Sequence, residues 1–160
     1  MKNGGFSLIE ITVAIALVGL MMGIGVPKFR NQIAIGKDTK AIAILSNLRT
    51  AGELYYLETG NTIVENPEEE MSIGEVLEVL EPYLDVKTFN EIKDGKLDIG
   101  GSRAKKSESD EADTKINYGG EIGLTFLNPE QGKLSDGVYI WFSPESGREY
   151  DTKGNRWIDY

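Results

Sequence analysis

The first sixty residues divide into an apolar stretch and an amphipathic one. From Phe6 to Val26 the residues are almost all apolar, and Glu10 carries the only charge. Beyond Pro27 the apolar positions recur at helical spacing, with polar residues between them. These positions are Ala41, Ile44, Leu45, Leu48, Gly52 and Tyr55. Gly60 is a typical helix stop, so the pattern predicts one continuous helix over 6–59, about 80 Å long at about 1.5 Å per residue.

The rest of the chain predicts short elements. Asn61 to Glu70 reads as an acidic loop, and Ser72 to Glu75 is a capping-box pattern that opens a helix through Leu80. A first short strand is expected in 89–99, followed by a mobile loop rich in glycine, serine and charge over 100–115. β-branched and aromatic residues predict strands in 115–125 and 137–142, and a hairpin around 151–155 in the segment 150–160. We expect an α+β fold in which a small antiparallel sheet packs against the amphipathic half of the long helix.

Composition limits the functions that are open to the chain. Its 160 residues allow one ordinary domain besides the N-terminal segment, and the net charge is −9. A nucleic-acid binder would carry a basic patch, which this sequence lacks, so no nucleic-acid partner is expected. There is no Cys and no His, which removes thiol nucleophiles, His-based triads and the usual zinc sites. We expect no enzymatic activity, no cofactor and no metal, and we assign Tyr139, Trp141 and Trp157 to the core or to interfaces.

Three interpretations compete for the apolar run. A secretory signal peptide would have an apolar core of about 7 to 15 residues and a small-residue cleavage site, and this run is longer. A plain single-pass anchor fits the length, because about 20 residues cross the hydrocarbon. Neither explains Glu10, since a charge inside a membrane helix costs roughly 2.5 to 3.5 kcal/mol on insertion scales.

The third interpretation accounts for Glu10 and for the glycines around it. The stretch resembles the N-terminus of type IV pilins and type II secretion pseudopilins. Gly5 and Phe6 match the family's prepilin peptidase site, Glu10 matches its fifth-residue glutamate, and Gly19 and Pro27 match its helix glycine and proline. The resemblance implies cleavage between Gly5 and Phe6, methylation of the new N-terminus at Phe6, and the lollipop plan of a long helix that carries a small antiparallel sheet. The implied parts are a leader (1–5), a membrane and filament-core helix (6–29) and a globular head (30–160).

Physical chemistry gives Glu10 a role in such a filament. Cleavage would create a cationic α-amine at Phe6, and the amine of an incoming subunit can meet Glu10 of its neighbour. The two charges are costly alone but attract strongly in a low dielectric. Their pairing selects the register and axial stagger of the subunits. The alternative is that Glu10 extends to the lipid headgroups, because it lies only one turn from the end of the helix.

The glycines of the apolar run point to packing and flexibility. Gly19 and Gly23 form a G-x-x-x-G spacing, which lets helices approach closely. Gly25 and Pro27 follow, and each lowers helix stability. Residues 19–27 are therefore predicted to be the softest part of the helix, a region that can melt or kink during assembly. A static kink in a membrane helix is the alternative.

The resemblance also implies partners and a location. The chain would associate with itself into a helical filament, after contact with prepilin peptidase, an inner-membrane assembly platform and membrane lipid. It would first lie in the bacterial inner membrane as a single-pass protein with a cytoplasmic N-terminus, then in a periplasmic or extracellular filament. The positive-inside rule alone does not set this topology, because Lys2 at one end is outnumbered by Lys28, Arg30, Lys37 and Lys40 at the other.

Two questions stay open at the level of sequence. Asp151, Lys153 and Asn155 alternate as calcium ligands do, and major pseudopilins carry a calcium site near the C-terminus, but Lys153 has the wrong charge. The type of filament is also open. Many pilins of Gram-negative bacteria have a C-terminal disulfide loop and this chain has no Cys, which favours a pseudopilin or a Cys-free pilin. A membrane-tethered binding protein is the alternative from a different class.

Overall fold

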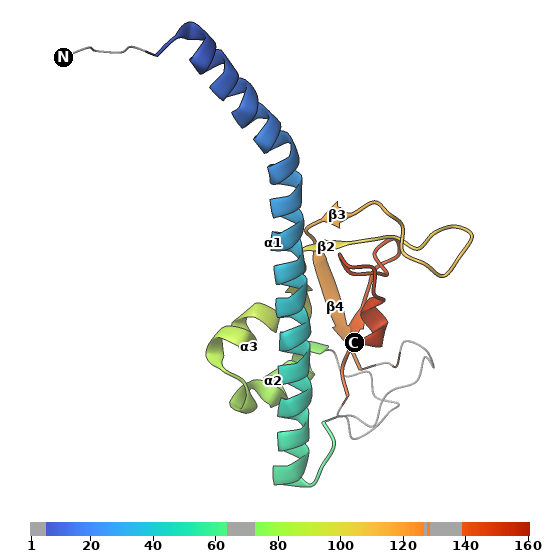
Figure 1. The fold of residues 1–160 in the computed structure, drawn as a ribbon. Helices are drawn as coiled ribbons and strands as arrows, with labels where there is room; N and C mark the ends of the chain where they lie inside the picture. Colours follow the sequence, from blue (N-terminus) through green and yellow to red (C-terminus); the bar gives the residue numbers. More distant parts are fainter. Residues whose placement is uncertain (1–5, 64–72, 127, 129–138) are drawn as a thin grey trace, which may run out of the picture. The chain divides into compact units, whose positions relative to one another are not determined.

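A computed structural model describes residues 6–63, 73–126, 128 and 139–160 (Figure 1). The chain divides into two compact units, Met1–Ile33 and Ala34–Tyr160, and the second unit is termed the head. Helix α1, Leu8–Thr59, supplies residues to both units. Gly60 follows it with a φ of +74°, and its N–H donates to the backbone oxygen of Tyr56 at 2.8 Å. The predicted long helix and its glycine stop are therefore confirmed.

Within its described residues, the head adds four short helical segments and two small sheets to the second half of α1. The helical segments before the sheet are α2 (Ile73–Leu80), η1 (Glu81–Tyr83) and α3 (Val86–Ile92). The strands are β1 (Lys96–Asp98), β2 (Gly101–Ser102), β3 (Asn117–Tyr118), β4 (Glu121–Thr125) and β5 (Trp141–Ser143), and η2 (Trp157–Asp159) follows them. β1, β4 and β5 form an antiparallel sheet in that order, and β2 pairs with β3. The α+β class and the small antiparallel sheet are confirmed.

The core of the head lies between α1 and the sheet. Leu45 and Leu48 of α1 are buried together with Ile122 and Phe142 of the strands, and Figure 1 shows β4 running beside the second half of α1. Trp157 is fully buried, with its ring edge-on to Phe142 at a centroid distance of 5.2 Å. The apolar face predicted for α1 is thus the face that packs. The core prediction is confirmed for Trp157, whereas Trp141 is half-buried and Tyr139 is exposed.

The short strand expected within 89–99 is confirmed as β1, which lies in the second half of that range. Residues up to Ile92 belong to α3, and only Lys96–Asp98 forms a strand. The cause is local: Asp85 is the N-cap of α3, and its carboxylate accepts hydrogen bonds from the N–H groups of Lys87 and Thr88. A capped first turn favours a helix over a strand. The predicted helix α2 is confirmed, while Ser72 and residues 64–72 lie outside the described part of the chain.

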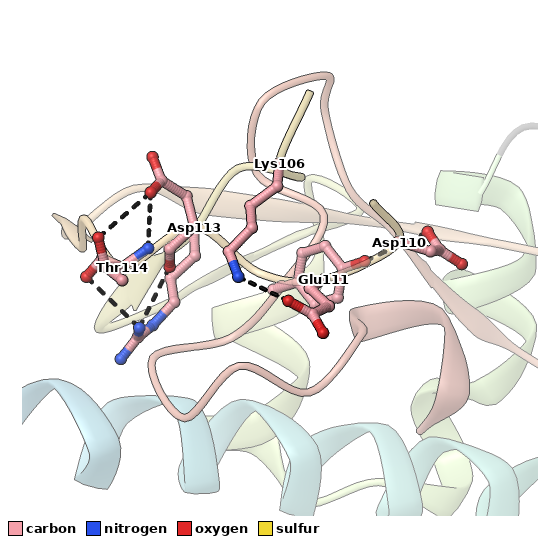
Figure 2. Close-up of polar contacts among 7 residues, drawn as sticks. Lys106, Asp110, Glu111, Asp113 and Thr114 are labelled. Carbon is pink, nitrogen blue, oxygen red and sulfur yellow. Dashed lines mark hydrogen bonds and ion pairs between the residues drawn. The ribbon is translucent and has the colours of Figure 1, made fainter. Parts of the chain in front are cut away.

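The loop expected over 100–115 has more structure than predicted. Gly101–Ser102 forms β2, and Arg103 donates to the backbone oxygens of Thr152 at 2.8 and 3.0 Å and Asp113 at 3.2 Å. Figure 2 shows the tip of the segment, where Lys106 and Glu111 form an ion pair at 2.6 Å. The low-complexity composition suggested mobility, but an arginine with several backbone acceptors ties the segment to the C-terminal hairpin.

The predicted C-terminal hairpin is present in a shortened form. Tyr150 and Arg156 form an isolated antiparallel bridge, but residues 157–159 form the 3₁₀ helix η2 and not a strand. The strands predicted in 115–125 are confirmed as β3 and β4. In the region 137–142 the described strand is β5, and residues 137 and 138 are outside the described part.

Candidate assembly helix and its attachment to the head

The N-terminus of α1 is closed by a capping box. The Ser7 hydroxyl accepts from the N–H of Ile9 at 3.2 Å, and the Glu10 carboxylate accepts from the N–H of Ser7 at 2.8 Å. This reciprocal pair satisfies donors that a helix start leaves open, and the helix dipole favours a carboxylate there. Within a single chain, the Glu10 carboxylate therefore already has a hydrogen-bond partner. The signal was visible in the sequence as Ser7-Leu8-Ile9-Glu10.

The segment from Phe6 to Val26 presents an apolar surface on all sides, and Glu10 carries its only charge. Every large apolar side chain from Phe6 to Val26 is exposed, and Phe6 itself is 85% exposed. Thr12 does not break the pattern, because its hydroxyl donates within the helix to the backbone oxygen of Leu8 at 2.9 Å. By length and composition, α1 qualifies to cross a membrane. Such a surface requires lipid or other apolar helices around it.

The predicted packing residues lie on this surface. A Cβ added at Gly19, Gly23 or Gly25 would meet nothing within 4 Å, and Pro27 stands inside a helix that continues past it. The chain by itself thus leaves the glycine positions open. Their role in packing and flexibility stays a prediction. Gly5 lies outside the described residues, so Phe6 is the one described residue of the predicted cleavage site.

Asp38 attaches α1 to the rest of the head, and no local pattern in the sequence marks it for this role. The side chain is buried at 3% exposure. One carboxylate oxygen accepts from the N–H groups of Gly100 at 2.7 Å and Gly101 at 3.3 Å, and the other from the N–H of Thr152 at 3.0 Å. Gly100 must be glycine here, because a Cβ would overlap the backbone of Ala34. No spacing rule finds such a residue, because its partners are 62 to 114 positions away.

Arg49 makes a second polar attachment. Its guanidinium donates to the backbone oxygens of Ile140 at 2.9 Å and Tyr160 at 2.6 Å. It also lies 4.0 Å from the centre of the Tyr139 ring, a cation–π distance. Burial lowers the pKa of Arg49 from its ordinary value, and the nearby Tyr139 opposes this shift. Asp38 and Arg49 therefore hold the C-terminal segment at two points along one helix.

The turn that resembled a calcium loop uses its oxygens internally. The buried Asp151 accepts from the Asn155 N–H at 2.8 Å, the Asn155 amide at 3.2 Å and the Tyr160 hydroxyl at 2.6 Å. Burial, together with this bond to Asp151, raises the pKa of Tyr160 to about 12. Among the described residues, no group of three or more Asp, Glu, His or Cys side chains is arranged to hold a metal ion. Asp151 therefore closes the hairpin with protein donors.

Comparison with known proteins gives relatives of one kind. A fimbrial protein of Pseudomonas aeruginosa is 37% identical over 60 residues, or 38% of each chain. The type IV major pilin protein PilE1 of Neisseria gonorrhoeae is 30% identical over 105 residues, 66% of this chain and 53% of the pilin. The prepilin peptidase-dependent protein D of Escherichia coli (strain K12) is 36% identical over 59 residues, 37% of this chain and 40% of that protein.

The matches cover only part of these proteins. The chain spans about half or less of the length of the curated relatives named above. No family model matches the chain. No solved structure matches it either.

Proposed function

Since the chain is a member of the family of type IV pilins and pilin-like proteins, we propose that it is a structural subunit of a type IV pilus-like filament. The precursor is inserted in the inner membrane, cut between Gly5 and Phe6 by prepilin peptidase, methylated at Phe6 and assembled through α1. The observation that carries this proposal is the apolar surface of residues 6–26, on which Glu10 is the only charge. The role is structural and not catalytic, because the relatives are named as pilins and fimbrial proteins.

The energetics of that surface require partners. Burying a large apolar side chain is worth roughly 1.5 to 3 kcal/mol, and all those from Phe6 to Val26 are exposed. Lipid buries these side chains before assembly, and the α1 helices of other copies bury them within a filament. The open Gly19 and Gly23 positions let neighbouring helices come close.

Glu10 supplies the specificity that apolar packing lacks. The cap leaves Glu10 held at the helix start, one turn from the position where cleavage would place a cationic amine. The amine of a second copy is then the charge that compensates the carboxylate in the dry core of the bundle. We propose that this pair sets the stagger between copies, while Gly25 and Pro27 allow α1 to adjust its course.

Processing and location follow from the same proposal. Prepilin peptidase acts on the cytoplasmic side, which places the N-terminus there and the head on the other side of the membrane. Lys28 and Arg30 then lie at the far end of the apolar segment, where lipid headgroups or the assembly platform can meet them. A secretion pseudopilus uses the same processing and the same helix.

Two measurements test the function. Mass spectrometry of the mature chain should find methylated Phe6 at the N-terminus; an intact Met1 would support a membrane tether, and a start near Val26 a signal peptide. Electron microscopy of cells with and without the gene should then find filaments that depend on it. Surface filaments indicate a pilus, and their restriction to the periplasm indicates a pseudopilus.

Substitutions of Glu10 separate its two roles. Glu10→Val removes both the cap and the charge and should abolish efficient assembly while processing and insertion continue. Glu10→Gln is the matched control, because its amide oxygen can still accept from Ser7 but carries no charge. If the charge pair is what matters, both variants fail to assemble; normal filaments from Glu10→Gln would reduce Glu10 to a helix cap.

A further inference from the structure

The head carries an exposed apolar surface at the end of α1. Leu54 and Leu57 are 47% and 78% exposed. Because a helix turns by about 100° per residue, Leu57 points about 180° away from the buried Leu48, and Glu53 shares this outward face. Glu53, Leu54 and Leu57 are termed the ridge. A helix face directed to water would normally carry polar residues at these positions.

A pocket of about 460 Å³ opens on a different part of the head. Its lining combines the apolar side chains of Phe142, Pro144 and Ile158 with two cations, Lys105 and Arg156, and two acids, Asp110 and Glu149. Glu149 accepts hydrogen bonds from the N–H groups of Lys105 at 3.1 Å and Gly147 at 2.8 Å. None of the ridge residues belongs to this lining. A concave, mainly apolar site with a few charged groups is the usual form of a binding pocket.

Arg156 is the cation of this pocket with free capacity. Lys105 is already paired with Asp110 at 2.8 Å. Among the described residues, Arg156 forms a salt bridge with Asp159 at 3.7 Å, and both side chains are partly exposed. Such a pair is weak, and a guanidinium has five donors. The pocket therefore offers an apolar wall with an adjacent cation for an incoming group.

We propose that the ridge of one copy docks into this pocket of a second copy, with Leu57 on the apolar wall and Glu53 beside Arg156. The proposal rests on the proposed function, because α1 packing in a filament holds the heads side by side and raises their effective concentration. The ridge supplies apolar side chains and an acid, and the pocket supplies an apolar wall and Arg156. The two acids of the pocket are engaged with Lys105 and with backbone N–H groups, so Arg156 is the charge that complements Glu53.

The geometry of this contact suits an open polymer. Ridge and pocket are different surfaces of the same chain, so the contact is heterologous. Each docking event leaves one free ridge and one free pocket, and a heterologous contact that does not close into a ring propagates as a filament. The contact therefore joins successive heads without limiting their number.

Cysteine crosslinking tests the contact directly, because the chain has no Cys of its own. Leu57→Cys is combined with Ser143→Cys, an exposed pocket residue. A disulfide forms only when the Cα atoms come within about 7 Å. Oxidised filaments of this variant should give a ladder of covalent multimers on a non-reducing gel. Val86→Cys with Ser143→Cys is the matched control, since Val86 is 77% exposed but lies outside the ridge, and should give no ladder.

Charge exchange gives a second readout in the 57–143 double-cysteine background. Arg156→Glu should lower the ladder yield, and Glu53→Arg added to it should restore the yield. Three results would overturn the ridge–pocket contact and leave the filament function intact. They are filaments that form without a ladder, an equal ladder from the Val86 control, and a ladder yield that the charge exchange does not restore. Absence of filaments and of processing in the unsubstituted chain would instead overturn the proposed function.

Discussion

Replacing Asp38 is the most direct test of how the head is held to α1. Its carboxylate accepts three backbone hydrogen bonds, from Gly100, Gly101 and Thr152, in a site with 3% exposure. Asp38→Ala removes the acceptor and leaves three buried N–H groups without it. Each unsatisfied buried donor costs about 1 to 3 kcal/mol. Water entry and relaxation reduce the sum, so we expect a loss of about 3 to 5 kcal/mol in the free energy of unfolding.

Asp38→Asn refines the test. The amide keeps one oxygen that can accept from one partner, but its NH₂ group then faces a backbone donor. We expect a loss of about 2 kcal/mol, smaller than for alanine because one acceptor remains. We therefore expect the free energy of unfolding to increase from Asp38→Ala to Asp38→Asn to the unsubstituted chain. This order is the signature of an acceptor that serves several donors.

Tryptophan fluorescence during denaturant unfolding measures these losses. The chain has two tryptophans, Trp141 and Trp157, and both lie in the head, so the signal reports this unit. Thr39→Ala is the control, because Thr39 is exposed on the same helix and its hydroxyl bonds only to the helix oxygen of Ile35. Its effect should stay within about 0.5 kcal/mol. An Asp38→Ala variant that differs from the parent by under about 1 kcal/mol would refute the reasoning.

Three further changes test other contacts by the same unfolding measurement. Gly100→Ala should cost about 3 kcal/mol or more because its Cβ would overlap helix backbone, whereas Gly36→Ala, with open space around it, should stabilise the helix by up to about 1 kcal/mol; equal effects would contradict the packing. The pKa of Tyr160 is raised to about 12, so the protonated hydroxyl stabilises the fold below pH 10, and this stabilisation is lost as the pH rises toward 12. The side chain is partly exposed, so we expect the loss in the free energy of unfolding to be roughly 1 kcal/mol. Tyr160→Phe should remove this pH dependence. Arg49→Lys should cost about 1 to 2 kcal/mol, because an ammonium cannot keep two diverging hydrogen bonds and the ring contact together; an unchanged midpoint would argue against the second attachment.

Local patterns predicted the long helix well. An apolar run, an amphipathic continuation and Gly60 each give a signal within a few residues, and the structure has α1 over Leu8–Thr59. The same kind of signal predicted α2 and β4. The short strand expected within 89–99 is β1, and the cap at Asp85 opens the helix α3, which lies before this strand and was not predicted.

The polar attachments could not be predicted in this way. Asp38 looks like an ordinary charged helix residue, and its partners become neighbours only after the chain has folded. The Ser7–Glu10 cap differs, because Ser-x-x-Glu is a local signature that the sequence already contained. A residue whose partners are local can be found from sequence, and one whose partners are distant requires the fold.

Asp38 and Arg49 together explain why the head has one register on α1. The apolar side chains between them, such as Leu45 and Leu48, would tolerate a shift along the helix, because dispersion contacts have little directional preference. A shift by one turn, about 5.4 Å, would move Asp38 away from its three N–H partners and Arg49 away from its two backbone oxygens. Buried donors and acceptors would then lose their partners at both ends, while the leucines would lose little. Apolar burial therefore stabilises the head. Asp38 and Arg49, which lie eleven residues apart on α1 and bond to backbone groups of the head, select its register along the helix.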